Sequence, residues 1–165
     1  MKRSPKLVLG LLALVAVLAV GPLTIWAETG KPAVHKPDAP QAETHHRIVF
    51  QISQNDPAAM NVALNNAENL SNFYKSRGET VEMEFVAYGP GLAMVRSDTS
   101  PVKDRLAAMT NSTKNLVVSG CGNTMSNQSK QENKEISLLP EARVVPTGIG
   151  RIVELQEQGW TYVRP

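Results

Sequence analysis

The chain has 165 residues, which suits one domain, and it carries 17 basic and 15 acidic residues for a formal net charge of +2. This near balance of charge excludes the strongly basic surface that nucleic-acid binding needs, so no nucleic-acid partner is expected. The single cysteine, Cys121, excludes an intramolecular disulfide. An ordinary hydrophobic core must therefore hold the fold together.

Residues 1–27 have the pattern of a secretory signal peptide. Three basic residues precede the apolar run Leu7–Val20, and Ala27 offers a small residue for cleavage. Cleavage would remove three of the 17 basic residues and no acidic residue, which changes the net charge from +2 to −1. The pattern predicts a periplasmic or secreted bacterial protein without a membrane partner. Because no charge lies between Lys6 and Glu28, the alternative is an uncleaved membrane anchor.

Residues 28–46 read as a Pro-rich linker, with three prolines and few apolar residues. His35, His45 and His46 lie in this segment and could together bind a metal ion. No second group of ligands has the spacing of a metal site. We therefore expect solvated linker histidines and no metal site.

The domain proper is expected over residues 47–165, and its first half contains two strands and two helices. A β-branched apolar run predicts a strand at Arg47–Ser53. A helix follows from Pro57, capped by Asn55 or Asp56, and ends at Gly78. The buried face of this helix is expected to contain Met60, Ala63, Leu64, Ala67, Leu70 and Tyr74. The helix is followed by a strand at 80–88, a turn at 89–91 and a short helix at 92–96.

The second half continues the alternation. Ser100 is expected to cap a helix with Pro101 in its first position. The apolar run Asn115–Gly120 predicts a buried strand, and a polar helix follows Cys121 and ends near residues 139–140. The remaining elements are a strand at 142–146, a helix at 148–159 with Ile149, Ile152, Val153 and Gln156 on one face, and a strand at 160–163.

The alternation of strands and helices predicts an α/β fold with a mostly parallel five-stranded sheet and helices on both faces. A flavodoxin-like strand order is the first expectation. Ligands of such sheets gather at the carboxyl ends of the strands, and three of these ends are glycine-rich here. The candidate ligand-binding residues at these ends are Gly89, Pro90, Gly91, Gly122, Asn123, Thr124 and Gly148. The stretch "GIGRIV" lacks the third glycine of a dinucleotide fingerprint, so no cofactor is expected.

Cys121 is the candidate catalytic residue. It ends a buried strand, and a helix is expected to begin directly after it. Backbone N–H groups and the positive end of that helix would favour a thiolate. Gly120 and Gly122 would leave the sulfur uncrowded, and Asn123 or Thr124 could hydrogen-bond it. The alternative is a small hydrophobic residue buried at the end of the strand.

Three stretches together resemble the DsrE/DsrF-like family, which is named for intracellular sulfur oxidation and is related to TusD. They are "YGPGL" from Tyr88, "CGNTM" from Cys121, and the ending "PTGIGRIVELQEQGWTYVRP" from Pro146. The resemblance spans Arg47–Pro165 and points to the exported, single-domain branch of the family. It implies a DsrE-like parallel sheet, a homo-oligomer (trimer or hexamer), and a sulfur-carrying cysteine whose position only Cys121 matches.

The cysteine's position and the resemblance together predict a periplasmic sulfur-handling protein. Cys121 would accept sulfane sulfur as a persulfide and pass it on, with a sulfur donor or acceptor protein as partner. One alternative is a non-catalytic oligomeric module that binds a small ligand or a partner and has a structural cysteine. A second alternative is a redox sensor that dimerises through Cys121.

Overall fold

The computed structural model describes residues 44–165, so the predicted signal peptide, His35 and most of the predicted linker lie outside the described residues. Within the described part, strands and helices follow one another along the chain. A 3-10 helix (η1) comes after the second strand. The bounds in chain order are β1 His45–Ile52, α1 Pro57–Ser76, β2 Thr80–Ala87, η1 Gly89–Val95, α2 Lys103–Ser112, β3 Leu116–Cys121, α3 Gly122–Glu132, β4 Ala142–Val145, α4 Gly148–Glu157 and β5 Thr161–Val163.

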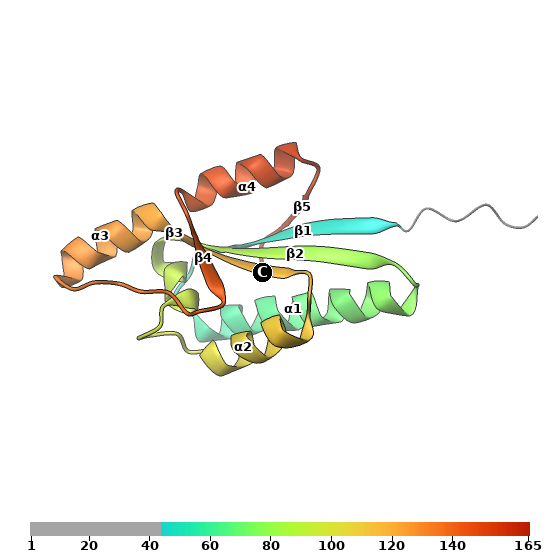
Figure 1. Cartoon of the computed structure of the whole chain (residues 1–165), viewed down its shortest axis with the longest axis horizontal. Helices are drawn as coiled ribbons and strands as arrows, with labels where there is room; N and C mark the ends of the chain where they lie inside the picture. The colour runs from blue at the N-terminus through green and yellow to red at the C-terminus, as the bar shows by residue number, and fades with distance from the viewer. Residues whose placement is uncertain (1–43) are drawn as a thin grey trace, which may run out of the picture. The chain divides into compact units, whose positions relative to one another are not determined.

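The strands form one parallel sheet with the order β4-β3-β2-β1-β5. Helices α1 and α2 cover one face of the sheet and α4 covers the other (Figure 1). The predicted α/β fold, with a parallel five-stranded sheet and helices on both faces, is thereby confirmed. The order in detail places β5 beside β1, whereas flavodoxin itself has the order 2-1-3-4-5. In residues 44–165, none of the helices combines the length and the apolar character needed to cross a bilayer.

The main core lies between the sheet and helices α1 and α2. Phe50 and Phe85 are fully buried there, with ring centroids 5.1 Å apart. The side chain of Asp56 caps α1 by accepting a hydrogen bond from the Ala58 N–H at 2.8 Å, as predicted. The helix turns the predicted apolar side chains inward, and the fully buried ones are Met60, Ala63, Leu64 and Ala67.

Strand β1 begins at His45, two residues before the expected start of the domain. The ring of His45 hydrogen-bonds Thr80 Oγ1 at 2.8 Å. The ring of His46 contacts Glu79 Oε2 at 2.7 Å and stacks on Tyr74. These two histidines therefore belong to the sheet and not to a solvated linker.

Helix α2 begins at Lys103 and not at Pro101. The Ser100 hydroxyl, which was expected to cap it, donates a hydrogen bond to the Met94 carbonyl oxygen at 2.5 Å. That bond fixes the exit from η1. Ser100 therefore stabilises mainly the loop before α2, and its oxygen accepts the Val102 N–H only at 3.4 Å.

Helix α3 ends at Glu132, earlier than predicted, because Asn133 adopts a left-handed conformation with φ of 48°. The residues that follow return to the core in extended form. Ile136 and Leu139 are buried there, and the Leu139 N–H donates to the Val95 carbonyl oxygen at 2.8 Å. The chain thus leaves α3 abruptly and is anchored again within a few residues.

The α4 face of the sheet contains a buried carboxylate. Glu84 on β2 is 1% exposed, and its two oxygens accept hydrogen bonds from Arg151 Nε and Nη2 at 3.0 and 2.8 Å. Ser119 Oγ and Arg143 Nη2 complete its partners at 2.7 and 3.0 Å. Burial raises the pKa of Glu84, but the bonds from Arg151 and Ser119 and the charge of Arg143 outweigh it and hold the pKa below its usual value.

The predicted apolar face of α4, which included Ile149 and Val153, was wrong, and the hydrogen bonds of Arg151 explain why. Ile149 and Val153 are 56% and 47% exposed, whereas Ile152 and Leu155 are buried in the second core cluster. With Arg151 directed at Glu84, the helix turns the next residue, Ile152, onto the sheet. Polar contact and apolar packing therefore set the rotation of α4 together.

We expect Arg151→Met to lower the free energy of unfolding by about 3 kcal/mol, because it leaves the buried Glu84 carboxylate with weaker compensation. Denaturant unfolding of the full chain measures this change. The double variant Glu84→Gln/Arg151→Met should be more stable than Arg151→Met alone, since it removes the uncompensated charge. Arg77→Met, which breaks an exposed ion pair with Glu79, should have a much smaller effect. A double variant no more stable than Arg151→Met would contradict this account of the site.

Candidate functional site

Cys121 is the last residue of β3 and the N-cap residue of α3. The apolar run of β3 ends here, and the polar sequence that follows winds into the helix. The Thr124 N–H donates a hydrogen bond to Cys121 Sγ, with an N–S distance of 3.4 Å. The thiol thus occupies the place that a Ser, Thr, Asp or Asn oxygen usually takes at a helix start. Its sulfur lies at the positive end of the helix.

A second helix begins beside the same sulfur. The N–H of Gly148, the first residue of α4, also contributes to lowering the pKa of the Cys121 thiol. Gly148 is buried against Tyr88, and a Cβ atom at this position would lie 2.7 Å from Tyr88 Cβ. Glycine therefore allows the start of α4 to approach this closely. The Tyr88 side chain is held in turn by Gln51 Nε2, which donates to its hydroxyl oxygen at 2.5 Å.

Thr124 connects the thiol to the start of η1. Its hydroxyl oxygen accepts the N–H of Gly89 at 3.0 Å, and the same hydroxyl helps to lower the pKa of the Cys121 thiol. The carbonyl oxygen of Gly89 accepts Gln128 Nε2 at 3.3 Å. Gly89 has φ of 54°, a conformation that favours glycine. Two side chains of α3 thus hold the turn that follows β2.

These contacts determine the acidity of the thiol. Burial raises the pKa of Cys121. Hydrogen bonds from the Thr124 hydroxyl and from the amides of Thr124, Gly148 and Asn123 outweigh the burial and hold the pKa below that of an ordinary cysteine. The arrangement therefore favours the thiolate, which is the nucleophilic form of the side chain.

The sulfur is not uncrowded, contrary to the expectation from its glycine neighbours. Cys121 is only 5% exposed. A Cβ atom on Gly120 would lie 2.6 Å from Leu138 Cδ1, and one on Gly122 would lie 3.2 Å from Val144 Cγ1. The two glycines thus make room for packed neighbours rather than for solvent.

The structure brings together most of the predicted ligand-binding residues. Pro90 is exposed on η1, and Gly91 packs against the end of β1, where a Cβ atom would lie 2.3 Å from the Ile52 carbonyl oxygen. Sequence reasoning missed Gln128, and it had noted Tyr88 only as the first residue of the "YGPGL" stretch at a strand end. The predicted residues that gather around the thiol are Gly89, Gly122, Asn123, Thr124 and Gly148.

An open cavity of about 320 Å³ lies between β4 and the first turns of α4. Its lining includes Val145, which pairs with Cys121 across the sheet, and two arginines that the sequence did not indicate. Both Arg143 and Arg151 are engaged by Glu84, and Glu154 lies 3.5 Å from Arg151. The charges of this cavity are balanced, so it does not by itself favour an anionic ligand. In the part of the chain from residue 44 onward, no group of three or more His, Cys, Asp or Glu side chains could hold a metal ion.

The chain was compared with known proteins. No family model matches it, and no curated protein matches it. A similar solved structure is that of MTH1491, a protein of unknown function from Methanobacterium thermoautotrophicum. The two sequences are 30% identical, the match covers 73% of this chain and 99% of that chain, and the TM-score is 0.62.

We expect the rate of Cys121 alkylation by iodoacetamide to reach half its maximum at a pH below about 8.5, the ordinary pKa of a cysteine. Thr124→Val removes the hydroxyl that donates to the sulfur, so the midpoint should move to higher pH. Ser126→Ala on the exposed side of the same helix is the matched control and should leave the midpoint unchanged. A Thr124→Val midpoint equal to that of the unmodified protein would show that this hydrogen bond does not stabilise the thiolate.

Proposed function

We propose that this chain, which belongs to the same family as MTH1491, handles sulfur by carrying sulfane sulfur as a persulfide on Cys121. The observation that carries the proposal is the thiol held by amides of two helix starts and by the Thr124 hydroxyl. A group with a lowered pKa at a strand end of an α/β sheet is a candidate nucleophile. The proposal agrees with the resemblance of the sequence to the DsrE/DsrF-like family.

The proposed transfer has two balanced steps. In the first, the Cys121 thiolate attacks the outer sulfur of a polysulfide or thiosulfate, the S–S bond of the donor breaks, and the bonding pair leaves with the donor remnant. Thiosulfate would leave as sulfite. In the second step, an acceptor thiolate attacks the outer sulfur of the Cys121 persulfide and restores the Cys121 thiolate. Neither step needs a proton or an external oxidant, because in each step the attacking thiolate supplies the electron pair of the new S–S bond.

The residues around Cys121 would have distinct roles. The amides of Thr124 and Gly148 would stabilise the anionic sulfur before attack and after release, because partial positive charge at a helix start favours anions. Gly122 and Gly148 would let the backbone approach the reacting atoms. Gly89 would hold the Thr124 hydroxyl in position.

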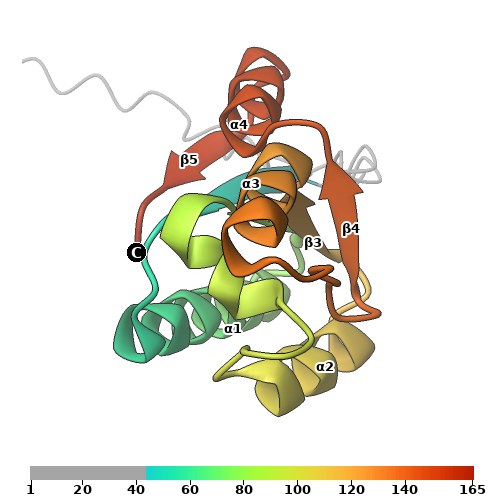
Figure 2. The same cartoon turned by 90° about the vertical axis from the view of Figure 1, so that its left-hand side faces the viewer.

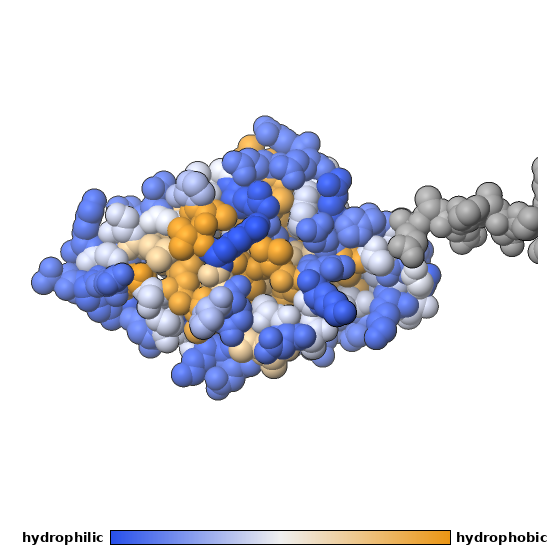
Figure 3. All heavy atoms as spheres, in the orientation of Figure 1, coloured by the Kyte–Doolittle hydropathy of each residue, from blue (hydrophilic) through white to orange (hydrophobic). Residues whose placement is uncertain are grey.

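We further propose a periplasmic or secreted location, which rests on the signal-like residues 1–27. The protein would work as a homo-oligomer, a trimer or hexamer, together with a sulfur donor or acceptor protein. Figure 3 supports an interface between subunits, because apolar surface lies on the side of the molecule where the edge strand β4 faces the viewer. Val144 on this strand is 57% exposed.

One observation favours a second candidate function. Because Cys121 is 5% exposed, it could be a structural residue in a non-catalytic oligomer that binds a small ligand or a partner. The same burial argues against the redox sensor, since an intermolecular disulfide needs the sulfur at the surface of the subunit.

Mass spectrometry of the full chain after exposure to polysulfide tests the main proposal. We expect a mass gain of one sulfur atom that maps to Cys121, is removed by a reducing thiol and is absent from Cys121→Ser. Transfer of that sulfur to an added thiol should restore the original mass. No gain, or an equal gain in Cys121→Ser, would defeat the persulfide proposal and leave the structural cysteine as the better reading.

A further inference from the structure

The buried position of Cys121 raises the question of how any reagent reaches it. The Thr124 N–H in the first turn of α3 donates to the sulfur at 3.4 Å, and Gly148, the first residue of α4, lies near enough to lower the pKa of the thiol. With 5% of the residue exposed, a segment packed around the site must move before a bulky group can contact the thiol, and the two helix starts are candidates for that movement.

Helix α4 is the firmly packed one of the two. Its Ile152 and Leu155 are 2% and 0% exposed and belong to an apolar cluster with Trp160, which follows the helix. Arg151 adds two hydrogen bonds to the buried Glu84. Displacing α4 would expose apolar side chains and a buried charge together, which is costly.

Helix α3 is attached in a different way. None of its side chains is fully buried, and Met125 packs only partly against the core. It lies in front of the carboxyl end of the sheet beside η1 (Figure 2). The helix is therefore held mainly by polar contacts, and a helix with few buried apolar contacts opens at lower cost than one packed in a core.

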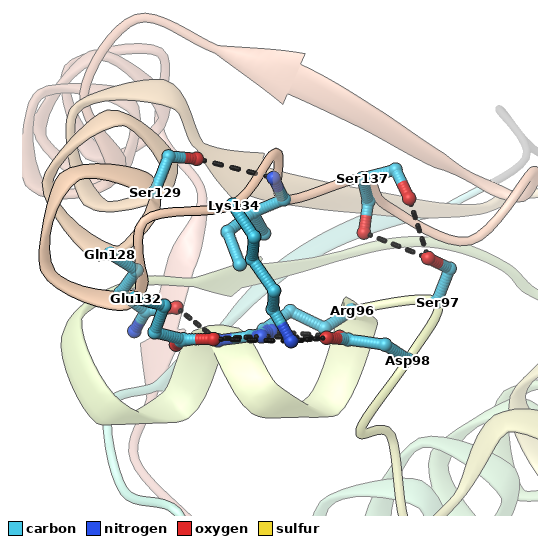
Figure 4. Close-up of polar contacts among 9 residues, drawn as sticks. Arg96, Ser97, Asp98, Gln128, Ser129, Glu132, Lys134 and Ser137 are labelled. Atoms are coloured by element: carbon cyan, nitrogen blue, oxygen red, sulfur yellow. Dashed lines mark hydrogen bonds and ion pairs between the residues drawn. The ribbon is translucent and has the colours of Figure 1, made fainter.

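Among these polar contacts, Arg96 makes three hydrogen bonds to side chains of α3 (Figure 4). It follows η1 and is 5% exposed. Its guanidinium donates to both Glu132 oxygens at 2.5 and 2.8 Å and to Gln128 Oε1 at 3.0 Å, all on α3. Asp98 accepts from the other side of the same group at 2.9 and 2.8 Å. Lys134 closes the cluster by contacting Asp98 Oδ2 at 2.7 Å.

The chain on either side of α3 has anchors of its own, although the N–H groups of Lys134 and Ile136 also donate to Ser129 on the helix at 3.2 Å. Before it, β3 is held between β2 and β4 in the sheet, and after it the Ser97 N–H donates to the Ser137 carbonyl oxygen at 3.0 Å. Gly122 and the left-handed Asn133 flank the helix. Movement of α3 would therefore break the contacts of Arg96 and of Ser129, while β3 and the bond between Ser97 and Ser137 stay in place.

We propose that α3 is a detachable cover over Cys121 and that Arg96 is the positioning residue that keeps it closed. The proposal deepens the proposed sulfur transfer, on which its biological meaning rests, by making access to the thiol depend on opening of the cover. Closing returns the Thr124 amide to the sulfur. Two properties of the site thus depend on different residues. Arg96 controls how easily a reagent reaches the thiol, and Thr124 and Gly148 lower the pKa of the thiol.

The pH profile of Cys121 alkylation by iodoacetamide in the full chain tests this separation. If the thiol reacts only in the open form and the closed form predominates, the midpoint reports the closed thiol and the plateau rate reports how often the cover opens. We expect Arg96→Met to raise the plateau about tenfold and to leave the midpoint unchanged. Glu132→Gln, a milder change at an exposed residue, should raise the plateau by a smaller factor.

Arg105→Met is the matched control, because Arg105 makes a similar polar contact with Asn61 and Asn65 on the opposite side of the molecule from α4. Its plateau should stay within about twofold of the unmodified protein. Amide hydrogen exchange should accelerate in residues 122–132 of Arg96→Met and not in residues 148–157. These two results would support a local cover.

Three outcomes would overturn the proposal. One is a plateau in folded Arg96→Met equal to that of the unmodified protein. Another is an equal rise in Arg105→Met with exchange accelerated throughout the chain, which would indicate global unfolding. If Arg96→Met does not fold, an unchanged plateau in Glu132→Gln decides against it. Since alkylation needs no sulfur transfer, failure of persulfide formation would leave this test intact.

Discussion

Two helices begin close to one sulfur atom, which caps the first of them, and the rest of the site depends on this convergence. β3 lies between β2 and β4, so its last residue, Cys121, meets the start of its own helix α3 and also the start of α4, which follows β4. Amides from both helices compensate the cost of burying the thiol. Without the glycine at position 148 the second helix could not approach, because Tyr88 already occupies the space that a side chain would need.

The layers of the molecule differ in what holds them. Apolar packing fixes α1 against one face of the sheet and α4 against the other, with the buried Glu84–Arg151 pair fixing the rotation of α4. Helix α3 at the carboxyl end relies on Arg96 and its carboxylate partners. Asp98 and Glu132 are 36% and 37% exposed, so water can reach these carboxylates, whereas it does not reach the buried apolar contacts of α4. A rigid sheet and a less firmly held helix thus meet at the thiol. The closed site keeps its hydrogen bonds to the sulfur, and movement of the helix decides whether a reagent can reach it.

The fold could be predicted from the sequence because its strands are short apolar runs that alternate with capped helical patterns. The position of Cys121 at a helix start followed from the same pattern. The rotation of α4 could not be predicted, because Ile149 and Val153 repeat with helical spacing as Ile152 does, and only the buried Glu84 decides between the faces. A carboxylate in the middle of a central strand was a signal that a basic partner exists, but not which one.

The burial of Cys121 was the other point beyond sequence reasoning. Gly120 and Gly122 suggested open space, yet Leu138 and Val144 fill it, and both come from segments that are distant in the sequence. The end of α3 at Glu132 was also missed, since it depends on the left-handed Asn133 and on the burial of Ile136. Long-range packing decides each of these features, so local patterns do not reveal them.

The central claim is that the closed, buried thiol of Cys121 ionises more readily than a free cysteine. The ultraviolet absorbance of the thiolate, taken as the difference between the full chain and Cys121→Ser during a pH titration, measures this without any reagent having to enter the site. The account predicts that the difference signal appears at a pH below about 8.5, the ordinary midpoint of a cysteine. A signal that appears only above that pH would mean that burial outweighs the helix amides, and it would contradict the account.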